Sequence, residues 1–157
     1  MNRSIPTLDR ADQQILAALQ SDARLSSAEL SEKVNLSTSP CWRRVKRLES
    51  LGVITGYHAR VDPVQLGYVV TALVQVSLIQ RNLDHMRVFE MAVRPLQEVI
   101  ACYSISGEYD YQLIVVAKSP TEFGDFARAH INACTSVKDV CTSFVVKEVK
   151  SLVAPPV

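Results

Sequence analysis

Cationic and hydroxyl side chains are concentrated between Leu36 and Leu51, in the stretch LSTSPCWRRVKRLESL. Arginine donates two parallel hydrogen bonds to guanine O6 and N7, and hydroxyl groups bond several base edges. Arginine and lysine also neutralise backbone phosphates. These residue types therefore indicate double-stranded DNA as a partner, and the predicted DNA-binding residues are Thr38, Ser39, Arg43, Arg44, Lys46 and Arg47.

The same stretch has the periodicity of an amphipathic helix. In steps of 100° per residue, Cys41, Val45 and Leu48 fall on one side. The opposite side carries Ser39, Arg43, Lys46, Arg47 and Ser50. Ser37 is the predicted N-cap, and Pro40 is tolerated in a first turn whose N–H groups lack helical partners. The helix has the width that the DNA major groove accepts.

Position along this helix predicts different roles for its polar residues. Ser39 and Arg43 lie near the N-terminal end, where bases are contacted. Lys46 and Arg47 lie further along, where phosphate contacts are expected, and Arg44 lies on the flank. A solvated basic face is the alternative interpretation, because basic amphipathic helices are common.

The preceding residues predict the other elements of a helix-turn-helix. Ser26 and Glu29 form a capping-box pattern, so a helix begins there and runs to about Val34. Residues 35–37 leave room only for a tight turn. An earlier helix is indicated by apolar residues at helical intervals, namely Leu8, Ala11, Ile15, Leu16 and Leu19. This arrangement favours DNA binding over a merely solvated face.

The helix at residues 36–51, the second of the helix-turn-helix, is the predicted DNA-recognition helix, and extended chain is predicted after it. Gly52 suits a C-cap, and residues 53–61 (VITGYHARV) have the composition of a strand interrupted by Gly56. We expect a wing or linker strand there, which completes a DNA-binding domain over residues 1–62.

Residues 63–157 are predicted to form a second domain with a different periodicity. The expected elements are a strand at 68–80, a helix between Asn82 and Pro95, strands at 99–106 and 111–118, a helix from Pro120 to about Cys134, and a strand at 140–149. Residues 107–110 are expected to form a tight hairpin turn. The order βαββαβ predicts a ferredoxin-like fold, with two helices on one face of a four-stranded antiparallel sheet. The whole chain is thus of the α+β class.

The second face of this sheet has no predicted cover within the chain. The apolar residues expected on it are Leu73, Ile100, Ile114, Val116, Val145 and Val149. Because a large exposed apolar face is unfavourable, we expect a second copy of the chain to pack there.

Composition and charge fit a cytoplasmic protein that binds DNA through a local basic patch. No apolar run approaches the ~20 residues of a membrane span, and the N-terminus lacks the apolar stretch of a signal peptide. The net charge is only +1, but residues 37–60 carry five Lys/Arg against Glu49. Such a small patch predicts that two or more subunits bind DNA together.

The chain shows no constellation that indicates a cofactor, a metal or catalysis. Its four cysteines form no CxxC pair, and no His lies near them in metal-binding spacing. No Ser/His/Asp or paired-carboxylate pattern emerges, which argues against an enzyme. Cys41 lies on the apolar side of the recognition helix, where a thiol is expected to be inert, although a redox role stays open.

Motifs across the chain resemble those of the leucine-responsive regulator/AsnC (Lrp/AsnC) family of transcription regulators. They include LDRAD at 8–12, LSTSPC at 36–41, RLE at 47–49, GEYDY at 107–111 and VVKEVK at 145–150. The resemblance implies a winged helix-turn-helix joined to a ligand-sensing βαββαβ domain. It also implies dimers through the sheet, commonly assembled into tetramers or octamers, and a small effector, usually an amino acid, bound between dimers.

Carried onto this sequence, the resemblance implies an effector site at the central hairpin. Its residues would be Ser104, Gly107, Glu108, Tyr109, Asp110, Ser143 and Phe144. Asp110 would accept the effector ammonium, and N–H groups of the Gly-containing turn would bind the carboxylate. Alternatively, Gly-Glu-Tyr-Asp is an ordinary hairpin turn in which Asp110 bonds its own backbone.

Two other functions remain compatible with these patterns. Ferredoxin-like modules also serve as amino-acid-binding regulatory subunits of enzymes, and fold alone does not fix function. An architectural DNA-binding protein without an effector is the second alternative. The sequence leaves effector identity, target genes, the sign of regulation and assembly size open.

Overall fold

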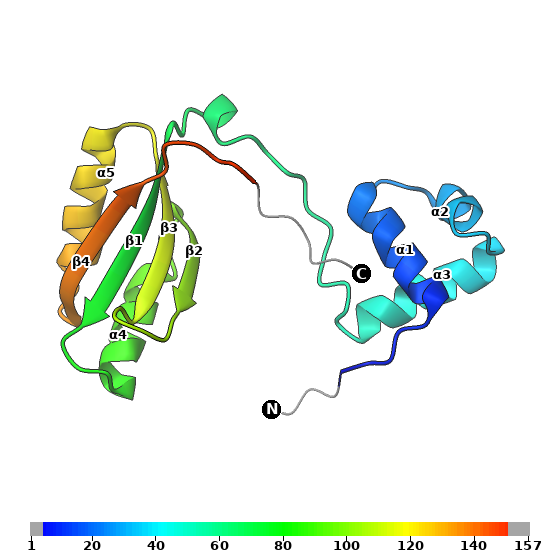
Figure 1. The fold of residues 1–157 in the computed structure, drawn as a ribbon, viewed down its shortest axis with the longest axis horizontal. Coiled ribbons are helices and arrows are strands. Elements are labelled where there is room, and N and C mark those ends of the chain that lie inside the picture. The colour runs from blue at the N-terminus through cyan, green and yellow to red at the C-terminus, as the bar shows by residue number, and fades with distance from the viewer. Residues whose placement is uncertain (1–4, 151–157) are drawn as a thin grey trace. The chain divides into compact units, whose positions relative to one another are not determined.

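The computed structural model describes residues 5–150, which form two compact units divided between Arg60 and Val61 (Figure 1). The predicted domain boundary after residue 62 falls close to this division. No helix in residues 5–150 has the length and apolar character needed to cross a membrane.

The first unit contains the three predicted helices: α1 (Arg10–Ser21), α2 (Ser27–Lys33) and α3 (Thr38–Ser50). The capping box predicted at the start of α2 is confirmed, since Ser26 and Glu29 bond each other's backbone N–H groups. Asn35 adopts a left-handed φ of 52° in the turn before α3. The three helices enclose one apolar core, made by Ile15, Leu16, Leu30, Val34, Cys41 and Leu48.

One local prediction for this unit is confirmed and another is wrong. Ser37 occupies the N-cap position of α3 as predicted, although its side chain makes no capping hydrogen bond. Residues 53–61 form no strand: Val53 and Ile54 instead pack against the helical core. Gly52 does end α3 as predicted, with a φ of 68° that favours glycine.

The second unit has the predicted βαββαβ order. Its elements are β1 (Val70–Leu78), α4 (Leu83–Val93), β2 (Val99–Ser104), β3 (Tyr111–Ala117), α5 (Pro120–Phe126) and β4 (Val137–Phe144), with a short 3₁₀ helix at Val64–Leu66. The strands form one antiparallel sheet in the order β2-β3-β1-β4. The ferredoxin-like fold is thus confirmed.

Alternation along β1 places the core on one face of this sheet. Ala72, Val74, Val76 and Leu78 are buried, in the period of two that a half-covered strand requires. They pack in one core with α4 and α5, through Phe89 of α4 and Phe123 of α5. Asn82 caps α4 as predicted, by accepting a hydrogen bond from the His85 N–H.

The last helix and the last strand differ from their predictions. The predicted helix from Pro120 becomes π-helical over Ala127–Asn132. The predicted strand at 140–149 begins earlier and ends at Phe144, because its length follows its pairing with β1. After it, the Val145 N–H bonds the Thr71 carbonyl oxygen.

The face of the sheet away from the helices exposes part of the predicted apolar set. Leu73 is 39% exposed and Ile100 is 60% exposed, and Ile114 pairs directly with Leu73. Val116 lies on this face too, two residues after Ile114, but only 6% of it is exposed. Val149 lies beyond the last strand.

Candidate functional site

An ion-pair cluster fixes the recognition helix α3 against the start of α1. Arg44 Nη1 donates to Asp9 Oδ2 at 2.7 Å and to Asp12 Oδ1 at 2.8 Å. Arg47 Nη2 lies 3.4 Å from Asp12 Oδ2 and donates to the Thr7 carbonyl oxygen at 3.3 Å. The Asp12 side chain is 0% exposed, so a buried carboxylate joins the two helices.

The same two aspartates cap α1. The Asp12 N–H donates to Asp9 Oδ1 at 2.9 Å, and the Asp9 N–H donates to Asp12 Oδ2 at 3.2 Å. The Asp12 N–H and the Arg44 guanidinium lower the pKa of the Asp9 carboxyl. The pair Asp9–Asp12 is a capping box with Asp in the place of the usual Glu, and sequence inspection missed it.

Two more of the predicted DNA-binding residues have partners within the unit. Thr38 Oγ1 lies 3.3 Å from Ser31 Oγ, and this contact ties the start of α3 to α2. Lys46 Nζ donates to Glu49 Oε2 at 2.7 Å, which is an exposed pair that solvent screens.

Ser39 and Arg43 differ from the other four. Both side chains are exposed, and within residues 5–150 neither makes a hydrogen bond or ion pair. They lie one helical turn apart near the N-terminal end of α3, so both face the same way. Arg44, in contrast, is committed to Asp9 and Asp12.

Cys41 lies in the core beneath α3, as its place on the apolar side predicts. It is buried, and this burial raises the pKa of its thiol. A protonated, buried thiol is a packing group and a poor nucleophile.

The predicted effector turn is a loop of six residues, 105–110, fixed to the end of β1. The Ile105 N–H donates to the Asp110 carbonyl oxygen, and the Asp110 N–H donates to the Val76 carbonyl oxygen, each at 2.9 Å. Asp110 Oδ2 accepts from the Leu78 N–H at 2.8 Å. Gly107 has a φ of 140°, which only glycine adopts readily.

Arg81 holds this loop from the segment after β1. Its Nε lies 2.7 Å from Asp110 Oδ1, and its Nη2 donates to the carbonyl oxygens of Gly107 at 3.0 Å and Glu108 at 2.9 Å. Both Asp110 carboxylate oxygens are therefore occupied, and the side chain is only 14% exposed. Asp110 therefore shapes the loop, and each of its two carboxylate oxygens already has a partner in this chain.

The loop has backbone donors without acceptors among the described residues, and its Tyr109 lies close to β4. In residues 5–150, the backbone N–H groups of residues 106–109 donate no hydrogen bond. The neighbouring Cys141 side chain on β4 raises the pKa of the Tyr109 hydroxyl, with further contributions from burial and from the charges of Glu108 and Asp139. Cys141 and Asp139 are thus close to the loop, although the sequence patterns placed neither of them at this site.

The remaining predicted effector residues do not all meet this loop within one chain. Ser104 does, because it pairs with Tyr111 at the loop's base. Ser143 pairs with Leu73 and Phe144 pairs with Ala72, near the other end of β1. At about 3.3 Å per residue, Leu73 and Leu78 are roughly 16 Å apart.

Ser143 and Phe144 also point to opposite faces of the sheet, since adjacent strand residues alternate. Phe144 packs on Phe123 of α5, with ring centroids 5.2 Å apart. Ser143 shares the helix-free face with Leu73. One subunit alone therefore cannot place both side chains in one pocket with the loop.

Removing the Arg81 side chain tests how the loop is held. In Arg81→Ala, Asp110 loses its cationic partner, so its bond to the Leu78 N–H opens more often. We expect amide hydrogen exchange at Leu78 to accelerate about tenfold, since a charged hydrogen bond contributes at least ~1.4 kcal/mol. Arg87→Ala, an exposed arginine on α4, is the matched control. Equal exchange at Leu78 in both variants would show that Arg81 does not hold the loop.

No group of three or more His, Cys, Asp or Glu side chains in residues 5–150 has the arrangement of a metal site. The chemistry that both regions offer is hydrogen bonding and charge: exposed donors on α3, and backbone donors with nearby carboxylates at the hairpin loop.

Two family models match the two units of the chain. The model for a winged helix-turn-helix DNA-binding domain matches residues 8–55, and the model for the Lrp/AsnC ligand binding domain matches residues 71–154. The first match contains all of α1, α2 and α3, and the second contains the hairpin loop.

Curated relatives match over nearly their whole length. The DNA-binding transcriptional activator DecR of Escherichia coli (strain K12) is 34% identical over 150 residues, which cover 96% of this chain and 99% of DecR. The Bkd operon transcriptional regulator of Pseudomonas aeruginosa is 37% identical over 149 residues, which cover 95% of this chain and 97% of that regulator.

Solved structures agree with this assignment. A transcriptional regulator of Neisseria meningitidis in complex with L-Met has a TM-score of 0.88 and 37% identity, with 92% of this chain and 94% of that chain covered. Escherichia coli AsnC has a TM-score of 0.87 and 26% identity, with 95% and 99% covered. The chain belongs to the Lrp/AsnC family, and it combines a winged helix-turn-helix DNA-binding domain with an Lrp/AsnC ligand-binding domain.

Proposed function

We propose that this protein is a sequence-specific DNA-binding transcriptional regulator in which Ser39 and Arg43 of α3 contact bases. The observation that carries the proposal is that the polar side chains of α3 fall into two groups, one paired within the unit and one exposed. Arg44, and in part Arg47, fix the helix to Asp12, whereas Ser39 and Arg43 are exposed and without partners in residues 5–150. A helix fixed from one side can present its other side to the major groove.

Lys46 and Arg47 are proposed to contact phosphates. Both lie further along α3 than Arg43, and both keep about half of their side chain exposed. Thr38 is proposed to contribute through its backbone position at the helix start, because its hydroxyl already contacts Ser31. Arg44 serves as a positioning residue.

We further propose that an amino acid binds at the hairpin loop and changes DNA affinity. Support comes from the L-Met complex of the Neisseria meningitidis relative and from the unused N–H groups of residues 106–109, which suit a carboxylate. Because Asp110 is occupied by Arg81 and Leu78, Glu108 and Asp139 are the better acceptors for an ammonium. Ser143 and Phe144 then join the site only from another subunit.

A dimer through the helix-free face of the sheet is part of this proposal. Leu73, Ile100 and Val145 are exposed there, and a second copy of the same face would bury them. Higher assemblies would bring hairpin loops of different dimers together, and two DNA-binding units would add their modest basic patches.

Fluorescence anisotropy with labelled DNA tests the proposal. The probes are the DNA upstream of the protein's own gene and a shuffled duplex of equal length, each titrated at several salt concentrations. We expect tighter binding to the upstream DNA and an affinity that falls steeply with salt for both. No binding at any salt concentration would favour an amino-acid-responsive enzyme subunit. Equal binding to both duplexes, with no amino acid raising the melting temperature, would favour an architectural DNA-binding protein.

A further inference from the structure

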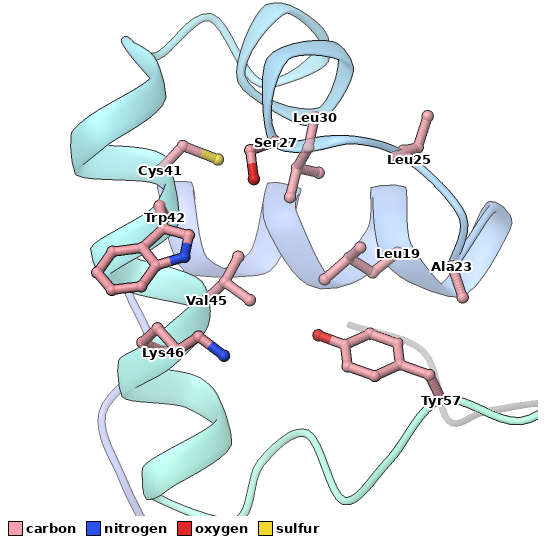
Figure 2. A pocket seen from close by; sticks show the side chains of 10 residues that line it. All are labelled: Leu19, Ala23, Leu25, Ser27, Leu30, Cys41, Trp42, Val45, Lys46 and Tyr57. Carbon is pink, nitrogen blue, oxygen red and sulfur yellow. The ribbon is translucent and has the colours of Figure 1, made fainter.

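A hollow of about 230 Å³ lies between α1, α2 and α3, and Tyr57 closes one side of it (Figure 2). It lies wholly within the first unit, away from the hairpin loop in sequence and in domain. Aliphatic side chains of the helical core form its walls, chiefly Leu19, Leu25, Leu30 and Val45. A benzene-sized or branched aliphatic group fits a space of this size and character.

The polar groups around this hollow all have hydrogen-bond donors. They are the Ser27 hydroxyl, the Trp42 indole N–H, the Lys46 ammonium and the Tyr57 hydroxyl. Figure 2 shows these four polar ends turned toward the space between the helices. No Asp or Glu is among the lining residues, so an acceptor for these donors inside the hollow would have to come from a ligand.

Lys46 and Tyr57 both donate to the Glu49 carboxylate, which is not among the residues that line the hollow. Glu49 accepts from Lys46 Nζ at 2.7 Å and from the Tyr57 hydroxyl at 3.1 Å. These two bonds lower the pKa of the Glu49 carboxyl, in that order of size. Because the Lys46 side chain is 54% exposed, it can exchange this carboxylate for another without a large desolvation cost.

We propose that this hollow is a second ligand site, for a small apolar carboxylate with an aromatic or branched aliphatic group. The apolar group would occupy the space between Leu25, Leu30 and Val45, and the carboxylate would accept from Lys46 and Tyr57 in the place of Glu49. The ligand would add a negative charge beside Lys46 and leave the Glu49 carboxylate on α3 without its cation, so it would weaken DNA binding. This site goes beyond the amino-acid effector proposed for the hairpin loop.

Trp42 gives a direct readout, because it is the only tryptophan of the chain and lines the hollow. The full-length protein is titrated with benzoate and with 4-methylpentanoate while Trp42 emission is followed. We expect a saturable change with at least one carboxylate. The uncharged analogues benzamide and 4-methylpentanamide should bind at least fivefold more weakly, since they lack the charge that Lys46 recognises.

Two variants assign the site. Ala23→Phe places a ring at the exposed rim of the hollow and should abolish the titration without altering the helical core. Lys46→Gln should weaken carboxylate binding about fivefold, whereas Arg43→Gln, which removes an equal charge from the same helix outside the hollow, should leave it unchanged. Thermal melting checks that each variant is folded.

The absence of any saturable change with both carboxylates in the parent protein would overturn the proposal. Equal affinity for acids and amides would also overturn it, because the charge would then play no part. Equal weakening by Lys46→Gln and Arg43→Gln would reassign the effect to general charge. If Ala23→Phe proves unfolded, the Lys46→Gln and Arg43→Gln pair still decides between these outcomes.

Discussion

Replacing Asp12 with alanine is expected to lower the free energy of unfolding of the DNA-binding unit by about 2–4 kcal/mol. The side chain is fully buried, and it accepts hydrogen bonds from Arg44 and from the Asp9 N–H. Its removal leaves the Arg44 guanidinium with Asp9 alone and an uncapped N–H at the start of α1. Removing one member of a buried ion pair lowers the free energy of unfolding by more than the intact pair contributes, because the remaining charge is left without an opposite charge beside it.

Urea unfolding followed by Trp42 emission measures this change, since Trp42 lies on α3 of the same unit. Asp22→Ala is the matched control. Asp22 also accepts from a backbone N–H and contacts an arginine, but its side chain is 41% exposed. We expect a loss of no more than about 1 kcal/mol for it. If both variants lose the same free energy, Asp12 does not join α1 to α3 as described.

Replacing Arg43 with alanine is expected to weaken binding to a specific DNA site about 10–100-fold, the equivalent of ~1–3 kcal/mol for a bidentate base contact. Binding to random DNA should fall much less, because only one phosphate-attracting charge is lost. Arg43 makes no ion pair in residues 5–150, so its removal should leave the unit's stability unchanged.

Competition between specific and random duplexes measures this difference for each variant. Arg24→Ala is the control for loss of charge, since Arg24 is 93% exposed and lies outside α3. We expect it to lower both affinities slightly and equally. An equal loss of specific and random binding in Arg43→Ala would reassign Arg43 to a phosphate contact.

Local patterns predicted the elements of both units, because capping and periodicity act over a few residues. The Ser26–Glu29 capping box and the alternation from Val70 to Leu78 both appear in the structure as expected. The link between Asp12 and Arg44 spans 32 residues, and no local pattern reveals it. The same holds for Arg81, whose carbonyl partners in the loop lie 26 and 27 residues away.

The wrong strand boundaries have a common cause. A strand exists only where a partner strand pairs with it, and composition does not report the partner. Residues 53–61 contain β-branched side chains but pair with no strand in residues 5–150. Val53 and Ile54 pack against the helical core instead. β4 starts at Val137 because Val137 pairs with Leu78, the last residue of β1.

The sequence did not show on which face of the sheet each predicted effector residue lies, or how far it lies from the hairpin loop. Ser143 and Phe144 follow one another in sequence, but their side chains lie on opposite faces, as strand geometry requires. Asp110 has the charge expected of an ammonium acceptor, yet Arg81 and the Leu78 N–H already occupy it. The residue types were enough to predict a loop at this position. The role of each loop residue depends on its hydrogen-bond and ion-pair partners, which the residue types do not reveal.

Coupling between an amino acid and DNA affinity tests the central claim most directly. The dissociation constant for the upstream DNA should be measured at fixed salt, alone and with each of the 20 amino acids, L-methionine among them. We expect at least one amino acid to change this constant by a factor of about five or more, the lower end of typical allosteric coupling. Specific DNA binding that no amino acid alters would contradict the account.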